Sequence, residues 1–163
     1  MSDQELGRSS QRVQDALDAL GVPSQIVYLP SGARTAAQAA QSIGCTVAQI
    51  VKSLIFRTVE TDRPVLVLTS GANQVDEQKI SHLLGERVRK ADAAFVRERT
   101  GFAIGGVPPV GHLEPLELFI DEDLLQFEEI WAAAGTPHTV FRLTPADLPK
   151  IAPGRVTAVR QDS

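Results

Sequence analysis

The feature that most constrains the fold is a pair of apolar segments with alternating side chains. From about Val51 the chain runs KSLIFRTV with a period of two, and PVLVLTS follows after the short segment ETDRP. Such alternation is typical of β-strands, and a polar link of this length is typical of a β-hairpin. We therefore expect residues 51–59 and 64–70 to pair as antiparallel neighbours.

The segments around this hairpin predict helices and strands in an irregular order. Helices with N-caps are expected over 35–44 and 76–85, and further helices over 92–100, before Gly21, after Thr46 and from Thr144. Strands are expected over 25–29, 115–120 and 139–143, and the segment 121–135 is compatible with either. This order does not show the regular alternation of βαβ units, which argues against a Rossmann fold. It favours an α/β protein of the α+β kind, with a mostly antiparallel or mixed sheet and flanking helices.

Length and composition fit one soluble globular domain. The chain has 163 residues, 43% of them hydrophobic and 22% charged, and no apolar run approaches the roughly 18 residues of a membrane span. The polar N-terminus does not fit a signal or transit peptide. A single cysteine, Cys45, excludes an internal disulfide and fits a reducing cytoplasm. His82, His112 and His138 lie far apart, so we expect no metal site.

The charge distribution gives only a weak indication of a nucleic-acid partner. The net charge is −4, whereas proteins that bind nucleic acids usually present a basic surface. The segment 86–99 nevertheless carries a local excess of basic residues, with five arginines and lysines against three carboxylates. Such a patch can serve transient binding to one end of a tRNA, but a solvated face is the commoner explanation of a charge run.

Lys52 is the first candidate for a functional side chain, because the common catalytic motifs are missing. The chain has no GxSxG, HExxH or GxxxxGK[ST] motif and no GxGxxG between a strand and a helix. In a strand over 51–59, Lys52 shares a face with Leu54 and Phe56, at the margin of an apolar surface. Its ammonium could there hold a phosphate, a carboxylate or a carbonyl oxygen. Alternatively, its stem lies on the core and the ammonium reaches water.

The second candidate is the loop GFAIGGVPPVGH, residues 101–112. Gly105 and Gly106 permit positive φ angles, so their backbone N–H groups can turn towards a ligand. Pro108 and Pro109 stiffen the end of the loop. Such a loop can bind an ester carbonyl and stabilise the oxyanion that forms when water attacks it. A structural turn between a helix and a strand explains the sequence equally well.

Four further positions have both a functional and a structural interpretation. Cys45 has no histidine nearby in sequence to activate its thiol. His112 either contacts substrate or makes a structural hydrogen bond, and the second is the commoner case. Asp121, after an apolar strand, is better explained as an N-cap than as a site carboxylate. The segment SGAN, residues 70–73, either lines a pocket or forms a turn.

Three segments together resemble the YbaK/prolyl-tRNA synthetase-associated domain. They are TAAQAAQSIGCTVAQIVKSLIF (35–56), VLVLTSGANQVDEQKI (65–80) and TGFAIGGVPPVGH (100–112), and the similarity continues through LFIDEDLL and WAAAGTPHTVF. The lysine of IVKSLIF combined with a downstream GxxxP motif is specific to this family. The resemblance covers about residues 10–150 and implies a single compact domain over 1–163, with a curved, mixed, largely antiparallel sheet surrounded by helices.

The resemblance also implies an activity. Members of the family are free-standing relatives of the editing domain of bacterial prolyl-tRNA synthetase, and they hydrolyse the ester between a wrong amino acid and its tRNA. This implies a cytoplasmic deacylase that removes Ala-, Cys- or Ser-type amino acids, with tRNA(Pro) as the expected tRNA. The implied partners are the acceptor end of aminoacyl-tRNA and prolyl-tRNA synthetase, and no cofactor or metal is implied.

The family's functional residues can be placed on this chain. The family lysine falls on Lys52, and the GxxxP motif falls on Gly105 through Pro109, whose backbone would bind the aminoacyl end. Further substrate contacts are expected from residues around these two elements: Tyr28, Thr35, Ser70, Gly71, Val107, Pro108, Pro109, Gly111 and His112. A serine that the cysteinyl subgroup uses near the pocket falls on Ala133, which leaves Cys-tRNA specificity open.

This mechanism needs neither a catalytic triad nor a metal. An aminoacyl ester is already activated, so positioning and oxyanion stabilisation can suffice, with a bound water or a group of the substrate as the nucleophile. A small pocket would exclude the larger, correct amino acid. Two other hypotheses stay open: a non-catalytic module that binds aminoacyl-tRNA or a synthetase, and a small-metabolite binding domain on the same scaffold.

Overall fold

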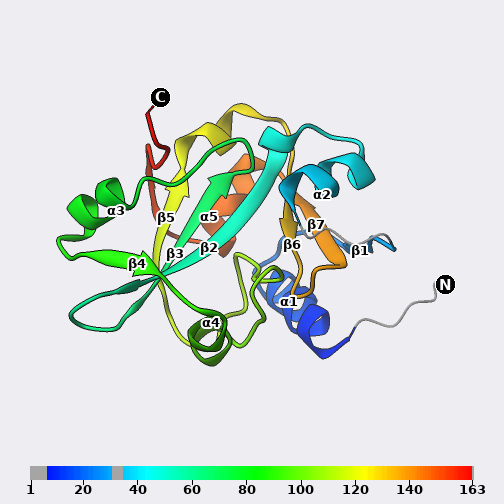
Figure 1. The fold of residues 1–163 in the computed structure, drawn as a ribbon. Coiled ribbons are helices and arrows are strands. Elements are labelled where there is room, and N and C mark those ends of the chain that lie inside the picture. Colours follow the sequence, from blue (N-terminus) through cyan, green and yellow to red (C-terminus); the bar gives the residue numbers. More distant parts are fainter. Residues whose placement is uncertain (1–6, 31–34, 163) are drawn as a thin grey trace.

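The computed structural model describes residues 7–30 and 35–162, which form one mixed sheet of eight strands with helices on both faces (Figure 1). The strands are β1 (Ile26–Tyr28), β2 (Ile50–Thr58), β3 (Pro64–Ser70), β4 (Val88–Lys90), β5 (Glu117–Asp121), β6 (Ile130–Ala133), β7 (Thr139–Leu143) and β8 (Arg155–Thr157). Their order is β1-β7-β6-β2-β3-β5-β8, and β4 pairs with β2 beside this path.

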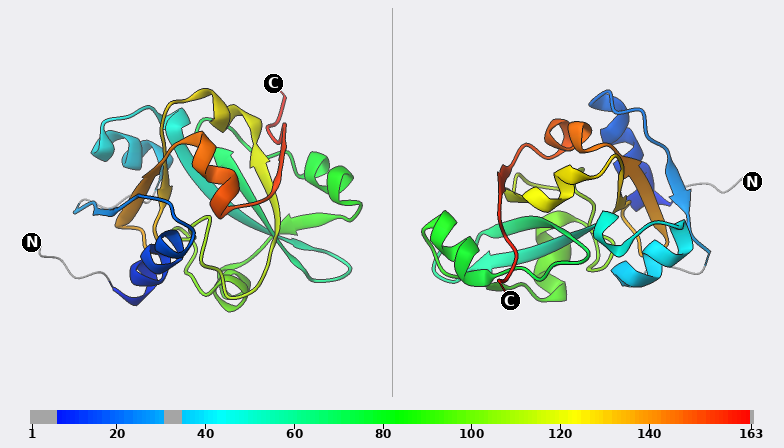
Figure 2. Two further views of the ribbon diagram at one scale, coloured as in Figure 1. Left: turned by 180° about the vertical axis from the view of Figure 1, so that it is seen from behind. Right: turned by 90° about the horizontal axis from the view of Figure 1, so that it is seen from above.

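The helices are short and lie around the sheet. They are α1 (Arg8–Ala19), α2 (Ala36–Ile43), α3 (Glu77–Leu84), α4 (Ala93–Thr100) and α5 (Leu148–Ile151), with 3₁₀ turns η1 (Val47–Gln49), η2 (Glu122–Gln126) and η3 (Pro145–Asp147). Helix α5 lies behind β2 and β3 in Figure 1 and in front of them when the molecule is turned by 180° (Figure 2). No helix in the described ranges has the length and apolar character needed to cross a membrane.

The predicted hairpin is confirmed as the β2–β3 pair. Its antiparallel register runs from Val51 opposite Ser70 to Arg57 opposite Pro64. All seven residues of β3 are buried, as expected for a continuous apolar strand with both faces covered. The link between the two strands turns at Asp62, which has a φ of 58°. The hairpin therefore supplies the two central strands of the sheet.

The two faces of β2 pack into different apolar clusters. Val51 and Ile55 face the larger cluster, to which α1, α4, α5 and the loop residue Val107 contribute. Leu54 and Phe56 face the second cluster, together with side chains of β3, β5 and α3. The alternation predicted for 51–59 is confirmed, and it places Lys52 on the same face of β2 as Leu54 and Phe56.

The N-caps predicted at Thr35 and Asp76 are confirmed, and Asp92 caps a third helix. The side chains of Thr35, Asp76 and Asp92 each accept a hydrogen bond from a backbone N–H in the first turn of α2, α3 and α4. Each of these helices ends at a glycine in the left-handed conformation, as expected for a C-terminal cap. Local chemistry therefore determines where these helices begin and end.

The structure also departs from the sequence-based expectation in several places. The ambiguous segment 121–135 contains η2 and strand β6, and the short helix expected after Thr46 is a single 3₁₀ turn because Ile50 already belongs to β2. Strands β4 and β8, of three residues each, were not expected. Four strand pairs are antiparallel and three are parallel among the described residues, so the sheet is mixed with only a slight antiparallel majority.

Candidate functional site

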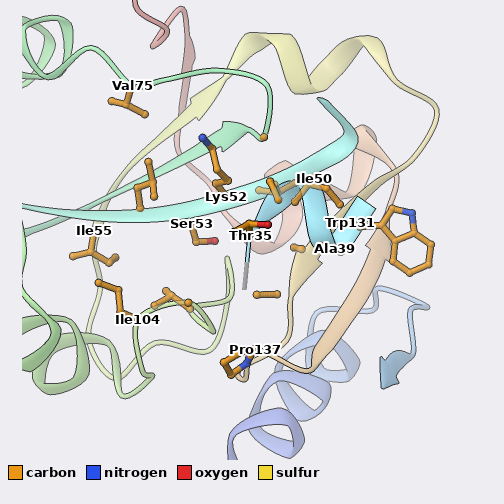
Figure 3. Close-up of a pocket in the computed structure, with 18 of the residues that line it drawn as sticks. Thr35, Ala39, Ile50, Lys52, Ser53, Ile55, Val75, Ile104, Trp131 and Pro137 are labelled. Atoms are coloured by element: carbon orange, nitrogen blue, oxygen red, sulfur yellow. The ribbon is translucent and has the colours of Figure 1, made fainter. Parts of the chain in front are cut away.

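A pocket of about 670 Å³ opens along the edge of β2 that faces away from β3 (Figure 3). On this edge β6 pairs only with Ile50 and Val51, and β4 pairs only with Phe56 to Thr58. Both flanking strands contribute lining residues, Ala132 and Ala133 from β6 and Lys90 from β4. The pocket therefore occupies the gap between these two strands, and its volume lies within the range of about 300–1,000 Å³ of small-molecule sites.

Lys52 lies in this gap and is half-buried, as the sequence predicts for a lysine at the margin of an apolar surface. Its Nζ donates a hydrogen bond of 2.7 Å to the carbonyl oxygen of Asn73. Burial lowers the pKa of Lys52 from its usual value, the Asp121 carboxylate acts in the opposite direction, and the positive charge of Lys90 lowers the pKa further. The ammonium is therefore held at a fixed place and has donors left for a ligand.

Asp121 organises the turn that receives Lys52. Its side chain is fully buried and accepts hydrogen bonds from Thr69 Oγ1 at 2.9 Å, the Ser70 backbone N–H at 3.0 Å and Asn73 Nδ2 at 2.8 Å. It also accepts one from the backbone N–H of Asp123, so the predicted N-cap of Asp121 is confirmed. The same carboxylate thus caps η2 and fixes Asn73, whose carbonyl oxygen binds Lys52.

The glycine-proline loop lies on the other side of β2. Gly105 has a φ of 89° and lines the pocket, as does the buried Val107. Gly106 does not line it. The N–H of Gly106 donates to the carbonyl oxygen of Ala103, and a Cβ there would lie 2.8 Å from Thr136 Cα. The N–H of Gly106 is thus already used within the loop, and its missing side chain lets the loop pack against Thr136.

Pro108, Pro109, Gly111 and His112 form the base of this loop and do not line the pocket. Both prolines are buried, and His112 Nε2 lies 2.6 Å from the carbonyl oxygen of Pro108. Burial lowers the pKa of His112, although the hydrogen bond to Pro108 opposes this. The Gly111 carbonyl accepts a hydrogen bond from Arg12 Nε. His112 is therefore the hydrogen-bonded loop histidine that was the commoner interpretation, and the substrate contacts expected from these residues stay predictions.

Lys52 and the loop thus lie on opposite sides of β2. Figure 3 shows Lys52 and Ser53 pointing from opposite sides of the strand, with Ser53 on the side of Ile104 and Pro137. We call the face with Lys52, Gln74 and Val75 the Lys52 side of the pocket. The face with Ser53, Ile104 and the Gly105–Val107 segment is called the loop side. A ligand that contacts both must pass along the open edge of β2.

The other predicted contact residues are divided between the pocket and its surroundings. Thr35 and Gly71 line the pocket, and a Cβ on Gly71 would lie 2.4 Å from the carbonyl oxygen of Val47. Ser70 lies behind the lining, where its Oγ donates to the carbonyl oxygen of Ala48. Tyr28 is 45% exposed and stacks on His138 outside the pocket. Ser70 and Tyr28 are therefore not part of the pocket wall.

The basic segment 86–99 is partly neutralised. Arg87 pairs with Glu60 and Arg99 with Glu114. Arg89, Lys90 and Arg97 are exposed and form no ion pair within the described ranges. Because Lys90 lines the pocket, positive charge reaches its rim.

Among the lining residues that the sequence did not predict, Ser53 and Trp131 carry buried polar atoms without a partner in the described part of the chain. Ser53 lies next to Lys52 on the opposite face, and its Oγ is buried without a hydrogen-bond partner. Trp131 of β6 also lines the pocket with its indole Nε1 buried and unpaired among the described residues. Buried polar atoms without partners are rare, so both are informative. In the sequence, only its position next to Lys52 could have indicated that Ser53 belongs to the site.

Nucleophilic and metal chemistry have little support from the described residues. Cys45 does not line the pocket, and burial raises the pKa of its thiol, which disfavours a reactive thiolate. The described residues contain no group of three or more His, Cys, Asp or Glu side chains that could hold a metal ion. Among the described lining residues, Glu77 is the one carboxylate.

Comparison with known proteins adds independent evidence. A family model described as the aminoacyl-tRNA editing domain matches residues 30–151. The uncharacterized protein YwhH of Bacillus subtilis is 32% identical over 125 residues, 77% of this chain and 79% of YwhH. Proline–tRNA ligase of Lactobacillus helveticus is 32% identical over 105 residues, which are 64% of this chain and only 18% of the ligase. The matched segments make up between 11% and 20% of such ligases.

A solved structure has the same fold throughout. The crystal structure of a candidate trans-editing enzyme for prolyl tRNA synthetase superimposes with a TM-score of 0.91 and 46% sequence identity. The match covers 97% of this chain and the whole of that one. The mixed sheet and its helices are therefore common to both proteins.

Proposed function

This chain belongs to the aminoacyl-tRNA editing domain family, and from this premise we propose that it is a trans-editing deacylase that removes a small, wrong amino acid from tRNA(Pro). The pocket at the open edge of β2 carries the proposal, because it combines the half-buried ammonium of Lys52 with the loop of Gly105 and Val107. The same family relationship supports prolyl-tRNA synthetase as a partner and the cytoplasm as the place of action.

The chemistry follows from the ester itself. Water attacks the carbonyl carbon, the carbonyl oxygen becomes an oxyanion, and the bond to the ribose oxygen then breaks to release the amino acid and free tRNA. We assign Lys52 to the electrostatic part of this reaction, in which its ammonium binds the terminal nucleotide or the ester oxygens. Gly105 and Val107 bound the aminoacyl group from the loop side.

No lining residue supplies an obvious protein nucleophile. No histidine or cysteine is found among the lining residues that the structure describes. We therefore infer that the nucleophile is a positioned water or a group of the substrate. This inference fits the reactivity of aminoacyl esters, for which correct positioning already contributes much of the rate.

The shape of the loop side supports selection by size. Val107 is 97% buried and is backed by the packed base of the loop, so this side cannot retreat to admit a larger side chain. Ala133 bears no polar group where the cysteinyl subgroup carries a serine. We therefore rank alanine and serine above cysteine as the residue removed, and expect proline to be spared.

A deacylation panel tests the proposal. We expect hydrolysis of Ala- and Ser-tRNA(Pro), weaker hydrolysis of Cys-tRNA(Pro), and none of Pro-tRNA(Pro). Lys52→Ala lowers kcat/KM by about 100-fold or more, in the range found for the loss of one oxyanion-stabilising donor. Lys90→Ala is the matched control, since it removes an exposed lysine from the rim of the same pocket. The Lys90→Ala variant is expected to weaken aminoacyl-tRNA binding only severalfold.

The alternatives predict other outcomes. A non-catalytic module binds aminoacyl-tRNA or a synthetase and hydrolyses no ester at any protein concentration. A metabolite-binding domain is stabilised by small molecules and shows no dependence on tRNA. Full activity of Lys52→Ala, with an unchanged melting temperature, would refute the role of Lys52 while leaving the deacylase intact.

A further inference from the structure

The open edge of β2 presents the backbone N–H and C=O of one residue, Ser53, to the pocket. The backbone N–H and C=O of one strand residue point to the same edge, and successive residues alternate. The Ile50 carbonyl oxygen accepts a hydrogen bond from the Gly71 N–H on the β3 side of the strand. The Ile55 carbonyl oxygen accepts one from the Ala91 N–H on the outer side. By this alternation the N–H and C=O of Ser53 point to the outer edge.

Ser53 has no strand neighbour on that edge within the described ranges. Pairing with β6 ends at Val51, and pairing with β4 begins at Phe56. Among the described residues, neither the registers of β4 and β6 nor the backbone hydrogen bonds of turns and loops reach the outer-edge N–H and C=O of Ser53. Its side-chain Oγ is also unpaired. Three polar groups of one residue are thus left unused at the pocket, where a ligand can satisfy them.

We propose that the aminoacyl group binds here as one added residue of the sheet, paired with Ser53. An amino acid esterified to tRNA has an α-ammonium that donates and an ester carbonyl that accepts, spaced like the N–H and C=O of a chain residue. A hydrogen-bonded antiparallel pair exchanges two such bonds. The α-ammonium donates to the Ser53 carbonyl oxygen, and the Ser53 N–H donates to the ester carbonyl oxygen. This proposal rests on the proposed function.

In this arrangement, each side of the pocket binds a different part of the substrate. Residues that pair directly across a sheet carry their side chains on the same face. The substrate side chain therefore lies on the loop side, with Ser53, Ile55 and Val107, where size selection was placed. The Lys52 side is left for the ester and the terminal nucleotide. The substrate then passes along the edge of β2 and contacts both sides.

The Ser53 N–H also becomes a donor to the oxyanion. When water adds to the carbonyl carbon, the negative charge develops on the oxygen that this N–H already binds. This matters because the N–H of Gly106 is used within the loop. The geometry thus supplies an oxyanion donor from the strand rather than from Gly106.

Substrate analogues test the pairing without altering the protein. The probe is adenosine carrying alanine in a 3′-amide linkage, titrated into the ¹⁵N-labelled protein. The Ser53 amide resonance is expected to shift downfield and to exchange more slowly with solvent. The second comparison is Ala-tRNA(Pro) against propionyl-tRNA(Pro), which lacks the α-ammonium. Each enzymatic rate is divided by the spontaneous rate, and kcat/KM for the propionyl ester is expected to be about tenfold lower or more.

Two variants separate the main chain of Ser53 from its hydroxyl. Ser53→Pro removes the outward N–H and leaves the β2–β3 hydrogen bonds in place, because proline is tolerated where the N–H faces away from the ladder. Ser53→Ala keeps the N–H and removes only the unpaired hydroxyl. Deacylation by Ser53→Pro is expected to fall about tenfold below that of Ser53→Ala.

The result that overturns the pairing is equal treatment of alanyl and propionyl esters together with an unshifted Ser53 amide. These two measurements use the wild-type protein and decide the question even if Ser53→Pro does not fold. A failure of the deacylase proposal looks different, because no ester is then hydrolysed. The amide shift still reports whether the aminoacyl unit binds at Ser53.

Discussion

The two sides of the pocket are built by different means. On the Lys52 side, the fully buried carboxylate of Asp121 collects four hydrogen bonds and fixes the Asn73 carbonyl that receives Lys52. On the loop side, Gly106 packs directly against the backbone of Thr136. The difference shows that one side is held by hydrogen bonds to a charge and the other by close packing.

The two means of construction fit the two functions proposed for these sides, charge stabilisation and selection by size. A charged donor must not move when the charge on the substrate changes, and a network of satisfied hydrogen bonds provides that rigidity. A size filter must resist expansion, and close-packed atoms provide that resistance. At the mouth, Ile104 is 57% exposed, so the loop side also offers an apolar surface to an incoming substrate.

The largest effect is expected from removing the carboxylate on the Lys52 side. Asp121→Ala leaves the buried donors of Thr69 and Ser70 without their acceptor and removes one of the two carboxylates to which Asn73 Nδ2 donates. Each unsatisfied buried group costs about 1–3 kcal/mol, so the free energy of unfolding falls by about 3–5 kcal/mol. Urea denaturation measures the change.

Asp123→Ala is the control for this change. The Asp123 side chain is only half-buried, where it pairs with Arg160 and accepts a second hydrogen bond from Asn73 Nδ2, which keeps its bond to Asp121. The loss of Asp123 therefore costs about 1 kcal/mol or less. Equal destabilisation by both variants would mean that the Asp121 network does not differ from a surface ion pair. The contrast between the two sides of the pocket would then be lost.

The next largest effect concerns the packing of the loop side. The Cβ in Gly106→Ala would lie 2.8 Å from Thr136 Cα and 2.9 Å from Thr136 N, both backbone atoms that cannot rotate away. We expect a loss of about 1–3 kcal/mol and a displaced loop. Deacylation then falls because Val107 moves with the loop. Thermal unfolding and kcat/KM for Ala-tRNA(Pro) measure the two effects.

Gly105→Ala is the matched neighbour. A Cβ at Gly105 meets no atom within 4 Å, but the φ of 89° strains any other residue. The expected cost is about 1–2 kcal/mol, of backbone origin only. If Gly106→Ala proves milder than Gly105→Ala, close packing against Thr136 does not hold the loop in place.

The contrast between these sides also explains what the sequence could predict. The period of two in 51–59 was enough to place Lys52 at the margin of an apolar face, because alternation is a local property of a strand. The caps at Thr35 and Asp76 were predictable for the same reason. The cap at Asp121 was recognised too, but its role behind Lys52 was not.

The features that the sequence did not predict depend on tertiary contacts. The open edge at Ser53 exists because β6 ends its pairing at Val51 and β4 begins at Phe56, and neither limit is written in β2 itself. Strand β4 has only three residues and lies in a segment that was noticed for its charge. The partners of Gly106 and His112 likewise depend on loop geometry. Motif similarity brought Lys52 and the loop together, whereas the structure places them on opposite sides of one strand.

The smallest effect is expected in the titration of Lys52, and it sharpens the description of the Lys52 side. Burial lowers the pKa of Lys52, Asp121 raises it and Lys90 lowers it. Lys90→Met therefore raises the pKa of Lys52, and Asp121→Asn lowers it. Glu77, at the start of α3, is the other charged group lining this part of the pocket and is left unchanged in both variants.

The sign of the functional consequence follows from the protonated form. Binding through the ammonium is fully present below the pKa of Lys52 and is lost as the pH rises through it. Because that pKa is lowered, the loss begins at a lower pH than for a free lysine side chain, earlier still in Asp121→Asn and later in Lys90→Met. Pulse labelling of Lys52 with an amine reagent across pH, read by mass spectrometry, measures this order without any substrate. Shifts of the same sign in both variants would show that Lys52 senses a change in the fold rather than the charges beside it.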